Sequence, residues 1–478
     1  MTDFKNYIAG EWVSANDSRQ NINPSNTDDI VGAYASADKT QMEDAIAAAE
    51  EASAMWSQSG PQQRFDCLDT IGTEILARKE ELGRLLSREE GKTLPEGIGE
   101  AARAGQIFKF FAGEALRLQG DSLPSVRPGV DVEVRREALG VVGVITPWNF
   151  PIAIPAWKIA PALAYGNTVV CKPADLTPGC AWALTEIISR SGLPAGVFNL
   201  VMGRGSVVGQ TLLEDPRVNG VSFTGSVGTG RRVAAACSGR GAKFQLEMGG
   251  KNPLVVLADA DIGNAVECAL NGAFFSTGQR CTASSRLIVA TSVHDQFVDM
   301  LSERIISLKV DDALKDGTQI GPVVDATQLA QDCEYIDIGK SEGADLVTGG
   351  ERLERDTPGF YLAPALFADT KNDMRINREE IFGPVASTIR VGDIDEAIAV
   401  ANDTEFGLSA GICTSSLAAS TRFKRESRAG MVMVNLPTAG VDYHVPFGGV
   451  KGSSYGQREQ GRYANEFYTT VKTAYTGV

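Results

Sequence analysis

The stretch GVVGVITPW, residues 140–148, begins the part of the sequence that decides the fold. The first residues of this stretch are apolar and do not alternate with polar ones, which is typical of a strand buried on both faces of a parallel sheet. Similar runs follow at 167–174, 196–203, 218–226 and 242–250, separated by segments of helical character. Strands that alternate with helices predict a doubly wound α/β sheet. Ligands bind such sheets at the carboxyl ends of the strands, where TPWN, KPAD, GRGS and FTGS stand here.

The sequence on either side of this region predicts further structure. Thr40 and Glu43 are interpreted as a capping box at the start of a first helix. A second alternation of strands and helices over roughly 250–450 predicts a second α/β domain. Residues 121–137 alternate like an exposed strand pair, and the C-terminal tail is a candidate edge strand. Pairing within one chain and pairing between subunits are both compatible with these two segments.

Composition excludes several classes of function. A length of 478 residues suggests two or three domains, and 43% hydrophobic with 22% charged residues is ordinary for a soluble globular protein. The net charge of −15 argues against a nucleic-acid partner or an anionic membrane surface. The N-terminal stretch MTDFKNYIAGEWV lacks the apolar run of a signal peptide, and no stretch reaches the ~18 apolar residues of a membrane span.

The cysteines and histidines limit the chemistry. Eight cysteines without a CxxC pair or regular spacing predict no metal site and no disulfide framework, and fit a reducing cytoplasm. The chain has two histidines, His294 and His444. Because most hydrolytic nucleophiles depend on a histidine base, any nucleophile here must recruit another group.

Two glycine-rich or charged stretches are candidates for nucleotide binding. The glycines of GSVGTG (225–230) would let a phosphate approach a helix N-terminus, but the spacing is not GxGxxG, and a plain tight turn is the simpler interpretation. Asp175, which follows a strand together with Lys172, could accept hydrogen bonds from ribose hydroxyls. A surface lysine beside a helix-start aspartate explains that pair equally well.

Three other residues are candidates for catalysis, each with a structural alternative. Cys281 lies in GQRCTASSR (278–286), although free cysteine is usually a small buried side chain. Glu247 leaves a buried-type strand into a Gly-Gly turn, which suits either a general base of raised pKa or a solvent-facing side chain. Asn149, between a tryptophan and a phenylalanine in TPWNFP, suits either an oxyanion donor or a turn.

Together these stretches resemble the aldehyde dehydrogenase superfamily. The resemblance runs from YIAGEWV to the C-terminal strand and rests on the ordered motifs TPWNFP, KPAD, FTGS with Gly230, LEMGGKNP, GQRC, EEIFGPV and PFGG. It implies a Rossmann-like cofactor domain from 1–118 and 139–249 and an α/β catalytic domain from 250–455. It also implies a small β oligomerisation element from 119–138 and 456–478, which makes the protein a homodimer or homotetramer.

The resemblance also implies NAD(P)-dependent oxidation of an aldehyde to a carboxylate. Cys281 would attack the carbonyl as a thiolate, favoured by a helix dipole, the cofactor charge or Arg280. The Asn149 amide and the Cys281 backbone N–H would hold the oxyanion of the thiohemiacetal. Hydride transfer to the nicotinamide would leave a thioester, and Glu247 would activate the water that hydrolyses it.

A set of cofactor contacts follows from the same comparison. Lys172 and Glu380 resemble the residues that hold the two ribose rings. The carboxylate of Asp175 would repel the 2′-phosphate of NADP, so NAD is the preferred cofactor. NADP use stays open, because this aspartate is shorter than the glutamate that the family more often has here, and Arg204 could lie near it in space. The full set of predicted contacts is Trp148, Lys172, Asp175, Gly205, Gly225, Ser226, Gly230, Met248, Glu380 and Phe382.

Within the superfamily, the stretch from GMVMVN to TAYT resembles the α-ketoglutaric semialdehyde (2,5-dioxopentanoate) dehydrogenases, as do KPADLTPGCAWAL and GQRCTASSRLIV. Their substrate is an acid with an aldehyde at the far end, so a cationic reader of the carboxylate is expected. Arg280 is the candidate, with a structural ion pair as the alternative. The expected pocket walls are Phe150, Trp157, Tyr443, His444 and Phe447.

Other functions stay open at this stage. Succinic semialdehyde dehydrogenases typically carry an arginine where this chain has Trp157, which weighs against that substrate. Another aliphatic or aryl aldehyde is compatible with the motifs. A non-catalytic binding protein of this family would be expected to lose its thiol or base, whereas Cys281, Glu247 and Asn149 are all present.

Overall fold

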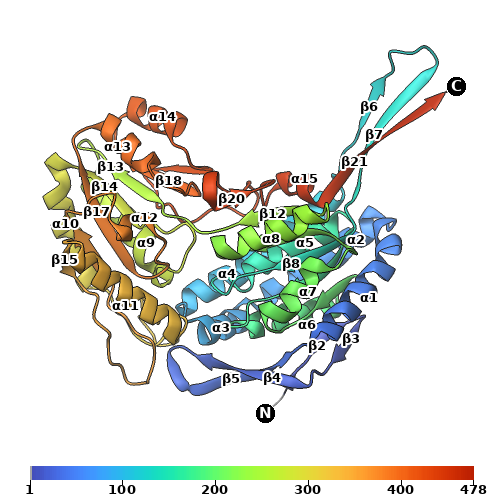
Figure 1. The fold of residues 1–478 in the computed structure, drawn as a ribbon, viewed down its shortest axis with the longest axis horizontal. Coiled ribbons are helices and arrows are strands. Elements are labelled where there is room, and N and C mark those ends of the chain that lie inside the picture. The colour runs from blue at the N-terminus through green and yellow to red at the C-terminus, as the bar shows by residue number, and fades with distance from the viewer. Residues whose placement is uncertain (1–2, 478) are drawn as a thin grey trace.

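Two sheet-centred α/β units and a projecting ribbon make up the chain in the computed structural model, which describes residues 3–477 (Figure 1). Parallel strands of the first sheet lie in the order β12–β11–β8–β9–β10. Their bounds are β8 Val141–Ile145, β9 Thr168–Lys172, β10 Phe198–Leu200, β11 Val218–Thr224 and β12 Lys243–Glu247. This order reverses between β8 and β11, as at the ligand crevice of a Rossmann sheet. The predicted strands and the predicted fold class are confirmed.

Helices cover both faces of this sheet. Val142 and Val144 point into one core with α2 (Pro61–Ala77), α4 (Leu94–Ala115), α5 (Ala153–Ala164) and α6 (Pro178–Ser189). Val141 and Val170 point into the opposite core with α1 (Lys39–Ser57), α7 (Gln210–Glu214) and α8 (Val227–Gly239). Because successive strand residues face opposite sides, runs without alternation are what a sheet covered on both faces requires.

The start of α1 differs from the prediction. The Asp38 carboxylate accepts a hydrogen bond from the Gln41 backbone N–H at 3.0 Å, so Asp38 is the N-cap. Thr40 and Glu43 lie inside the helix, and the predicted capping box is wrong. An aspartate two residues upstream already satisfies the free N–H, which leaves Thr40 no capping role.

Strands β2 (Asn6–Ile8) and β3 (Glu11–Val13) extend this sheet beyond β10, and β20 (Ser454–Tyr455) pairs antiparallel with β12. β20 falls at the end of the range 250–455 that the sequence assigns to the catalytic domain. In the structure this strand belongs to the edge of the first sheet, where it faces the end of β12. On the N-terminal side, β1 (Asp3–Phe4), β5 (Asn26–Ser36) and β4 (Asp17–Asn23) form a separate small sheet.

The second α/β unit has a sheet of order β15–β16–β17–β14–β13–β18–β19, parallel except for β15. Helices α9 (Ile262–Phe274) and α10 (Thr291–Ile306) cover one face, and α13 (Ile394–Asn402) and α14 (Leu417–Glu426) cover the other. The strands are β13 Pro253–Val256, β14 Arg286–Ala290, β15 Asp345–Thr348, β16 Ala365–Ala368, β17 Val385–Val391, β18 Ser409–Cys413 and β19 Met431–Val434. No helix between residues 3 and 477 is both long and apolar enough to cross a membrane.

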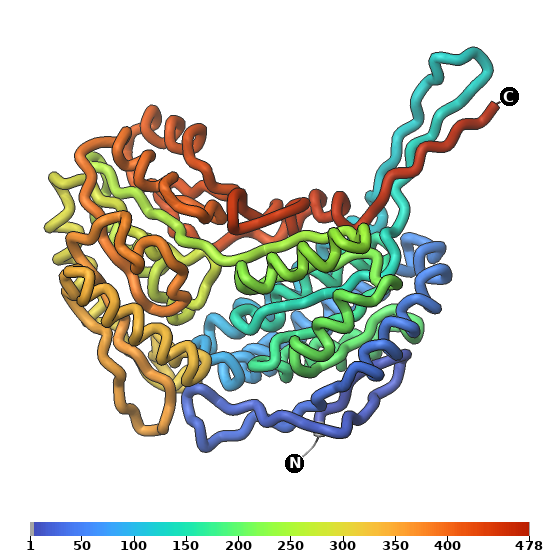
Figure 2. Tube along the Cα trace, viewed as in Figure 1, coloured from blue at the N-terminus to red at the C-terminus, as the bar shows by residue number. Residues whose placement is uncertain are grey.

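The ribbon consists of β6 (Asp121–Pro124), β7 (Val130–Ala138) and β21 (Thr469–Gly477), which pair antiparallel within one chain. Figures 1 and 2 show it extending away from both α/β units, with the C-terminal strand along its side. The predicted element 456–478 contributes to the ribbon only from Thr469 within the described residues. Phe467 and Tyr468, just before it, are buried in the core of the first unit.

Helix α4 lies against α3 (Lys79–Glu90) at a pair of glycines. A Cβ on Gly97 would stand 2.5 Å from the carbonyl oxygen of Gly83, and a Cβ on Gly83 would stand 2.5 Å from the backbone nitrogen of Ile98. The two helix backbones therefore touch, which only glycine permits. This contact fixes the position of α4, whose next two turns carry charged side chains toward the second unit.

Gly97→Ala is predicted to destabilise the protein by about 1–3 kcal/mol, because the added methyl group forces α3 and α4 apart. The measurement is urea unfolding followed by circular dichroism. Gly99→Ala is the matched control on the same helix, since nothing lies within 4 Å of a Cβ at Gly99. Gly99→Ala should stabilise the protein by up to about 1 kcal/mol, because alanine has a higher helix propensity than glycine. Equal effects of the two substitutions would contradict the close contact.

Candidate active site

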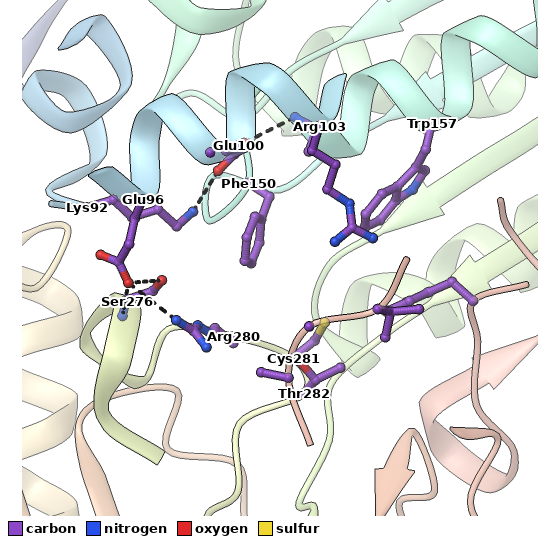
Figure 3. A pocket seen from close by; sticks show the side chains of 16 residues that line it. Lys92, Glu96, Glu100, Arg103, Phe150, Trp157, Ser276, Arg280, Cys281 and Thr282 are labelled. Atoms are coloured by element: carbon purple, nitrogen blue, oxygen red, sulfur yellow. Dashed lines mark hydrogen bonds and ion pairs between the residues drawn. The ribbon is translucent and has the colours of Figure 1, made fainter. Parts of the chain in front are cut away.

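A cavity of about 270 Å³ lies between α4, the start of α5, the segment that ends at Thr282 and the loop before Phe447 (Figure 3). Cys281 lies at its inner side. Helix α4 contributes Glu96, Glu100 and Arg103, and α5 contributes Trp157. The cavity thus forms where the first α/β unit faces the second, and its wall comes from segments far apart in the sequence.

A strained turn precedes Cys281. Ser276, Thr277 and Gly278 have φ angles of 52°, 57° and 66°, and the first two are not glycine. Such a conformation persists only where neighbouring contacts enforce it. Glu96 supplies these contacts: its Oε1 accepts from the Ser276 backbone N–H at 2.8 Å and from the Ser276 hydroxyl at 2.9 Å. The first turn of α4 therefore fixes the turn that presents Cys281.

The Gly-Gly pair of LEMGGKNP packs against the same loop. A Cβ on Gly250 would lie 2.6 Å from the carbonyl oxygen of Cys281, and a Cβ on Gly249 would lie 2.0 Å from the Glu380 carboxylate. The Gly250 N–H donates to Glu380 Oε1 at 2.8 Å, and Asn252 Nδ2 donates to the Cys281 carbonyl at 2.8 Å. A side chain at Gly250 would displace the Cys281 backbone, whereas one at Gly249 would displace the Glu380 carboxylate.

Burial raises the pKa of the Cys281 thiol to about 12, and the carboxylates of Glu247 and Glu380 add to this effect. The backbone N–H groups of Cys281 and Thr282 act in the opposite direction by favouring the thiolate. The thiol is therefore protonated at neutral pH in the protein alone. A bound positive charge near the sulfur would be needed to produce the reactive thiolate.

Asn149 lies close to the Cys281 loop. Its side-chain Nδ2 donates to the Gln279 carbonyl at 3.0 Å, and its own backbone carbonyl accepts from the Lys92 ammonium. An amide carries two N–H donors, so the second stays available for another acceptor. Lys92 in turn donates to Glu100 Oε2 at 2.9 Å. The predicted oxyanion donor is thus held rigidly from two sides.

Glu247 ends β12 and is buried. Its Oε2 accepts from the Ser454 hydroxyl of β20 at 2.6 Å. Burial raises the pKa of Glu247 well above its usual range, and the nearby Glu459 carboxylate adds to the shift. A carboxylate of raised pKa is a stronger base once ionised, as general-base catalysis requires. Its charge also raises the pKa of the Cys281 thiol.

The crevice between β8 and β11 suits a polar cofactor. Thr146 Oγ1 and Thr224 Oγ1, just at the carboxyl ends of these strands, are buried and have no hydrogen-bond partner among residues 3–477. Helix α8 begins beside them with Ser226 as N-cap and no acidic residue in its first turn. Its positive dipole end therefore favours an anion such as a pyrophosphate. The residues present fit a dinucleotide.

Further along the same edge, Lys172 and Asp175 are paired at 2.7 Å, and Arg19 lies 3.8 Å from Asp175. A small cavity next to them is lined by Arg19, Asp175 and Arg204, among others. A carboxylate among basic groups can accept hydrogen bonds from a ribose, while its charge opposes a phosphate. The sequence indicates Arg204 as a basic group near Asp175, but it gives no sign that Arg19 lies there.

The other predicted cofactor residues lie around the crevice. A side chain at Gly230 would displace the Met248 thioether, and a side chain at Gly225 would displace the Phe223 ring. Gly205 begins the short helix before α7, with Lys172 Nζ 3.8 Å from the place of its Cβ. The Trp148 and Phe382 rings meet edge to face at 5.4 Å.

The predicted substrate residues are divided by the structure. Phe150, Trp157, Arg280 and Phe447 line the cavity. Tyr443, which was also expected as a pocket wall, is not part of the lining. His444 is exposed, packs edge to face against Tyr443 and is likewise not part of the lining. Its placement in the pocket is therefore corrected: the ring belongs to a surface loop that joins the lining residues Val441 and Phe447.

Arg280 forms a structural ion pair, which was the alternative to binding the substrate carboxylate. Its guanidinium lies 3.3 Å from Glu96 Oε1 and contacts the Asn271 carbonyl at 3.4 Å. Its charge is thus matched by a carboxylate that also holds the strained turn.

Sequence reasoning missed Arg103, Lys92 and Glu100. Glu96, Glu100 and Arg103 stand at positions i, i+4 and i+7 of one helix, which places them on one face. A charged helical face is usually solvated, and this spacing alone gives no reason to place it in a cavity. The signal that could have found them is the unusual richness in glycine and alanine around these charges.

The comparisons with known proteins agree with this geometry. The family model "Aldehyde dehydrogenase family" matches residues 12–474. The chain belongs to the aldehyde dehydrogenase family. The resemblance inferred from the motifs is thereby confirmed.

Among individual proteins, the chain is 45% identical to the α-ketoglutaric semialdehyde dehydrogenase of Bacillus subtilis, over 99% of this chain and 98% of that protein. It is 43% identical to the α-ketoglutarate semialdehyde dehydrogenase of Haloferax volcanii, over 99% of each. A crystal structure of Staphylococcus aureus betaine aldehyde dehydrogenase in complex with NAD+ has a TM-score of 0.97 at 34% identity, covering 99% of this chain and 95% of that one. An NADP-dependent enzyme of E. coli has a TM-score of 0.96 at 36% identity, covering 100% and 98%.

The raised pKa of Cys281 predicts slow alkylation of this aldehyde dehydrogenase without cofactor. Since only the thiolate reacts, the iodoacetamide rate should rise by about tenfold per pH unit from pH 7 to 9 without a plateau. The measurement is mass spectrometry of the Cys281 peptide in a Cys333→Ser background, because Cys333 is the other half-buried cysteine among the described residues. A plateau near pH 7 would contradict the raised pKa.

Proposed function

We propose that this aldehyde dehydrogenase oxidises α-ketoglutaric semialdehyde to 2-oxoglutarate with NAD. The observation that carries the proposal is a cavity next to Cys281 that is lined by Arg103, a partly buried arginine with no carboxylate partner within the described residues. Such a cavity suits an aldehyde that carries an anion. The names of the two relatives at 45% and 43% identity support the same substrate.

In the proposed mechanism Cys281 forms a bond from its sulfur to the aldehyde carbon. The carbonyl oxygen becomes an oxyanion, and the free N–H of the Asn149 amide and the Cys281 backbone N–H hold it. Lys92 fixes Asn149 through the backbone carbonyl, so the amide needs no reorganisation. Bound NAD(P) supplies the acceptor for the hydride that the carbon loses, which leaves a thioester on Cys281.

Glu247 completes the cycle in this proposal. Its carboxylate takes a proton from a water molecule as that water attacks the thioester carbon. The carbon–sulfur bond then breaks, which restores the Cys281 thiolate. The acid product and Glu247 each release one proton to solvent, and the product leaves as a carboxylate. Ser454 holds Glu247 Oε2 at 2.6 Å and leaves the other oxygen to face the water.

We infer that NAD is preferred over NADP. Asp175 would accept from the ribose hydroxyls and repel a 2′-phosphate, while Lys172 partly neutralises it at 2.7 Å. Trp148, Gly205, Gly225, Ser226, Gly230, Met248, Glu380 and Phe382 are proposed to hold the rest of the cofactor. We also propose that the ribbon joins subunits into a dimer or tetramer, because it extends away from the body with Leu123, Val471 and Tyr475 exposed.

The substrate proposal predicts a ranking over an aldehyde panel. With NAD, kcat/KM for α-ketoglutaric semialdehyde should exceed that for pentanal, benzaldehyde and cationic betaine aldehyde by at least about tenfold, because the latter three lack the distal carboxylate. Initial-rate NADH formation measures this. Cys281→Ala is the blank and should abolish the reaction. A leading uncharged aldehyde would overturn the substrate, and residual full activity of the blank would overturn the mechanism.

The cofactor proposal predicts that Asp175→Ser raises the ratio of kcat/KM with NADP to that with NAD by about tenfold or more. The substitution removes the repelling carboxylate and leaves Lys172, Arg19 and Arg204 near the 2′-phosphate. Steady-state kinetics with both cofactors gives the ratio. Asp373→Ser, an exposed aspartate elsewhere, is the control with the same change of charge. An unchanged ratio for Asp175→Ser would remove Asp175 from cofactor choice.

A further inference from the structure

The charges around the cavity are paired, with one exception. Arg280 is matched by Glu96 at 3.3 Å, and Lys92 by Glu100 at 2.9 Å and Glu90 at 3.9 Å. Arg103 differs from both, because no ion pair within the described residues includes it. Its NH2 group donates to Gln460 Oε1 at 3.3 Å, and its buried Nε has no hydrogen-bond partner in that part of the chain. The cavity therefore carries one uncompensated positive charge.

The carboxylates that face Arg103 do not neutralise it. Glu100, one turn before it on α4, accepts from the Ile152 and Ala153 backbone N–H groups at 3.0 and 3.1 Å and from Lys92. Both of its oxygens thus already accept hydrogen bonds from other donors. Asp442 is exposed at the loop near the cavity and forms no ion pair with Arg103 in the described structure. Burial lowers the pKa of Arg103, and the charges of Glu100 and Asp442 offset this effect only in part.

The side chain of Arg103 also points into the cavity. Figure 3 shows its side chain reaching from α4 into the space above Cys281, with its guanidinium beside the indole of Trp157. The Trp157 Nε1 is buried and likewise has no acceptor among the described residues. Phe447 packs against this indole at 5.3 Å and fixes its plane. Two unpartnered donors from two helices therefore converge on one end of the cavity.

We propose that Arg103, together with the indole N–H of Trp157, binds the distal carboxylate of the acid semialdehyde substrate. A guanidinium receives a carboxylate through paired N–H donors, and a partly buried guanidinium without an ion pair gains from such a partner. Gln460 orients the guanidinium from the side. Arg280 is excluded from this role, because a second carboxylate there would meet the charge of Glu96. The inference rests on the proposed function and names the residue that selects its substrate class.

Arg103→Gln tests the assignment through a ratio of substrates. The ratio of kcat/KM for α-ketoglutaric semialdehyde to that for pentanal should fall by about 10- to 100-fold, because a charge-assisted pair is lost for the acid alone. The ratio should fall less in Arg103→Lys, since lysine keeps the positive charge but lacks the planar guanidinium with its paired N–H donors. Trp157→Phe should lower the ratio by about three- to tenfold. Arg117→Gln removes an exposed arginine just after the same helix and is the matched control, with no change in the ratio.

Binding of 2-oxoglutarate to the cofactor-free enzyme, measured by calorimetry, gives a second readout. Its dissociation constant should rise by about tenfold or more in Arg103→Gln. An unchanged ratio and unchanged binding in this variant would overturn the assignment, as would a collapse of the ratio in Arg280→Gln alone. If Arg103→Gln does not fold, an unchanged ratio in both Arg103→Lys and Trp157→Phe overturns it.

The wild-type panel separates this inference from the proposed function. If another acid semialdehyde leads, the proposed substrate is wrong, and the Arg103 ratio is measured with that acid instead. If no acid is preferred over pentanal, Arg103 reads no carboxylate and both proposals fail. If α-ketoglutaric semialdehyde leads and Arg103→Gln keeps that preference, the proposed function stands and the Arg103 inference alone is overturned.

Discussion

The buried carboxylate of Glu100 connects the parts of this site. It accepts from the first backbone N–H groups of α5 and from the Lys92 ammonium, and Lys92 holds the carbonyl of Asn149. One turn earlier Glu96 holds the strained turn before Cys281 and pairs with Arg280. Removing one partner of a buried ion pair typically costs about 3–5 kcal/mol. Helix α4 thus positions both the proposed nucleophile and the proposed oxyanion donor, and its own position depends on the glycine contact with α3.

Burial also sets the protonation of the reactive groups. The pKa of Cys281 is raised to about 12 and that of Glu380 to about 7, and the pKa of Glu247 is raised well above its usual range. The carboxylates of Glu247 and Glu380 oppose ionisation of the Cys281 thiol, so this thiol is protonated near neutral pH in the protein alone. Positive charge brought by a bound ligand would favour the thiolate.

Much of the fold could be predicted because its signals are local. The strands β8, β9, β11 and β12 are continuous apolar runs, and each ends in a turn that carries polar residues or glycine. Asn149 stands in the turn after β8, Glu247 is the last residue of β12, and Cys281 follows the strained turn at 276–278. The Asn149 side chain donates to the Gln279 carbonyl, which brings two of these segments together. The predictions that needed correction concern details beyond a single segment: Asp38 caps α1 instead of Thr40, and His444 lies at the surface. The sequence does not decide whether the ribbon strands pair within one chain or between subunits, because alternation alone does not identify the partner of a strand.

The sequence by itself determined the fold class and the family, because apolar periodicity and the order of motifs are properties of the chain read in one dimension. The tertiary structure alone decided which charges are paired. Arg280 lies next to the nucleophile in the sequence, yet Glu96 from a distant helix neutralises it, whereas Arg103 is far away in the sequence and reaches the cavity without a carboxylate. Coulomb interactions depend on distances in space, and residue spacing along the chain does not give these distances. The chemistry of the backbone turns could therefore be predicted, and the charge balance of the pocket could not.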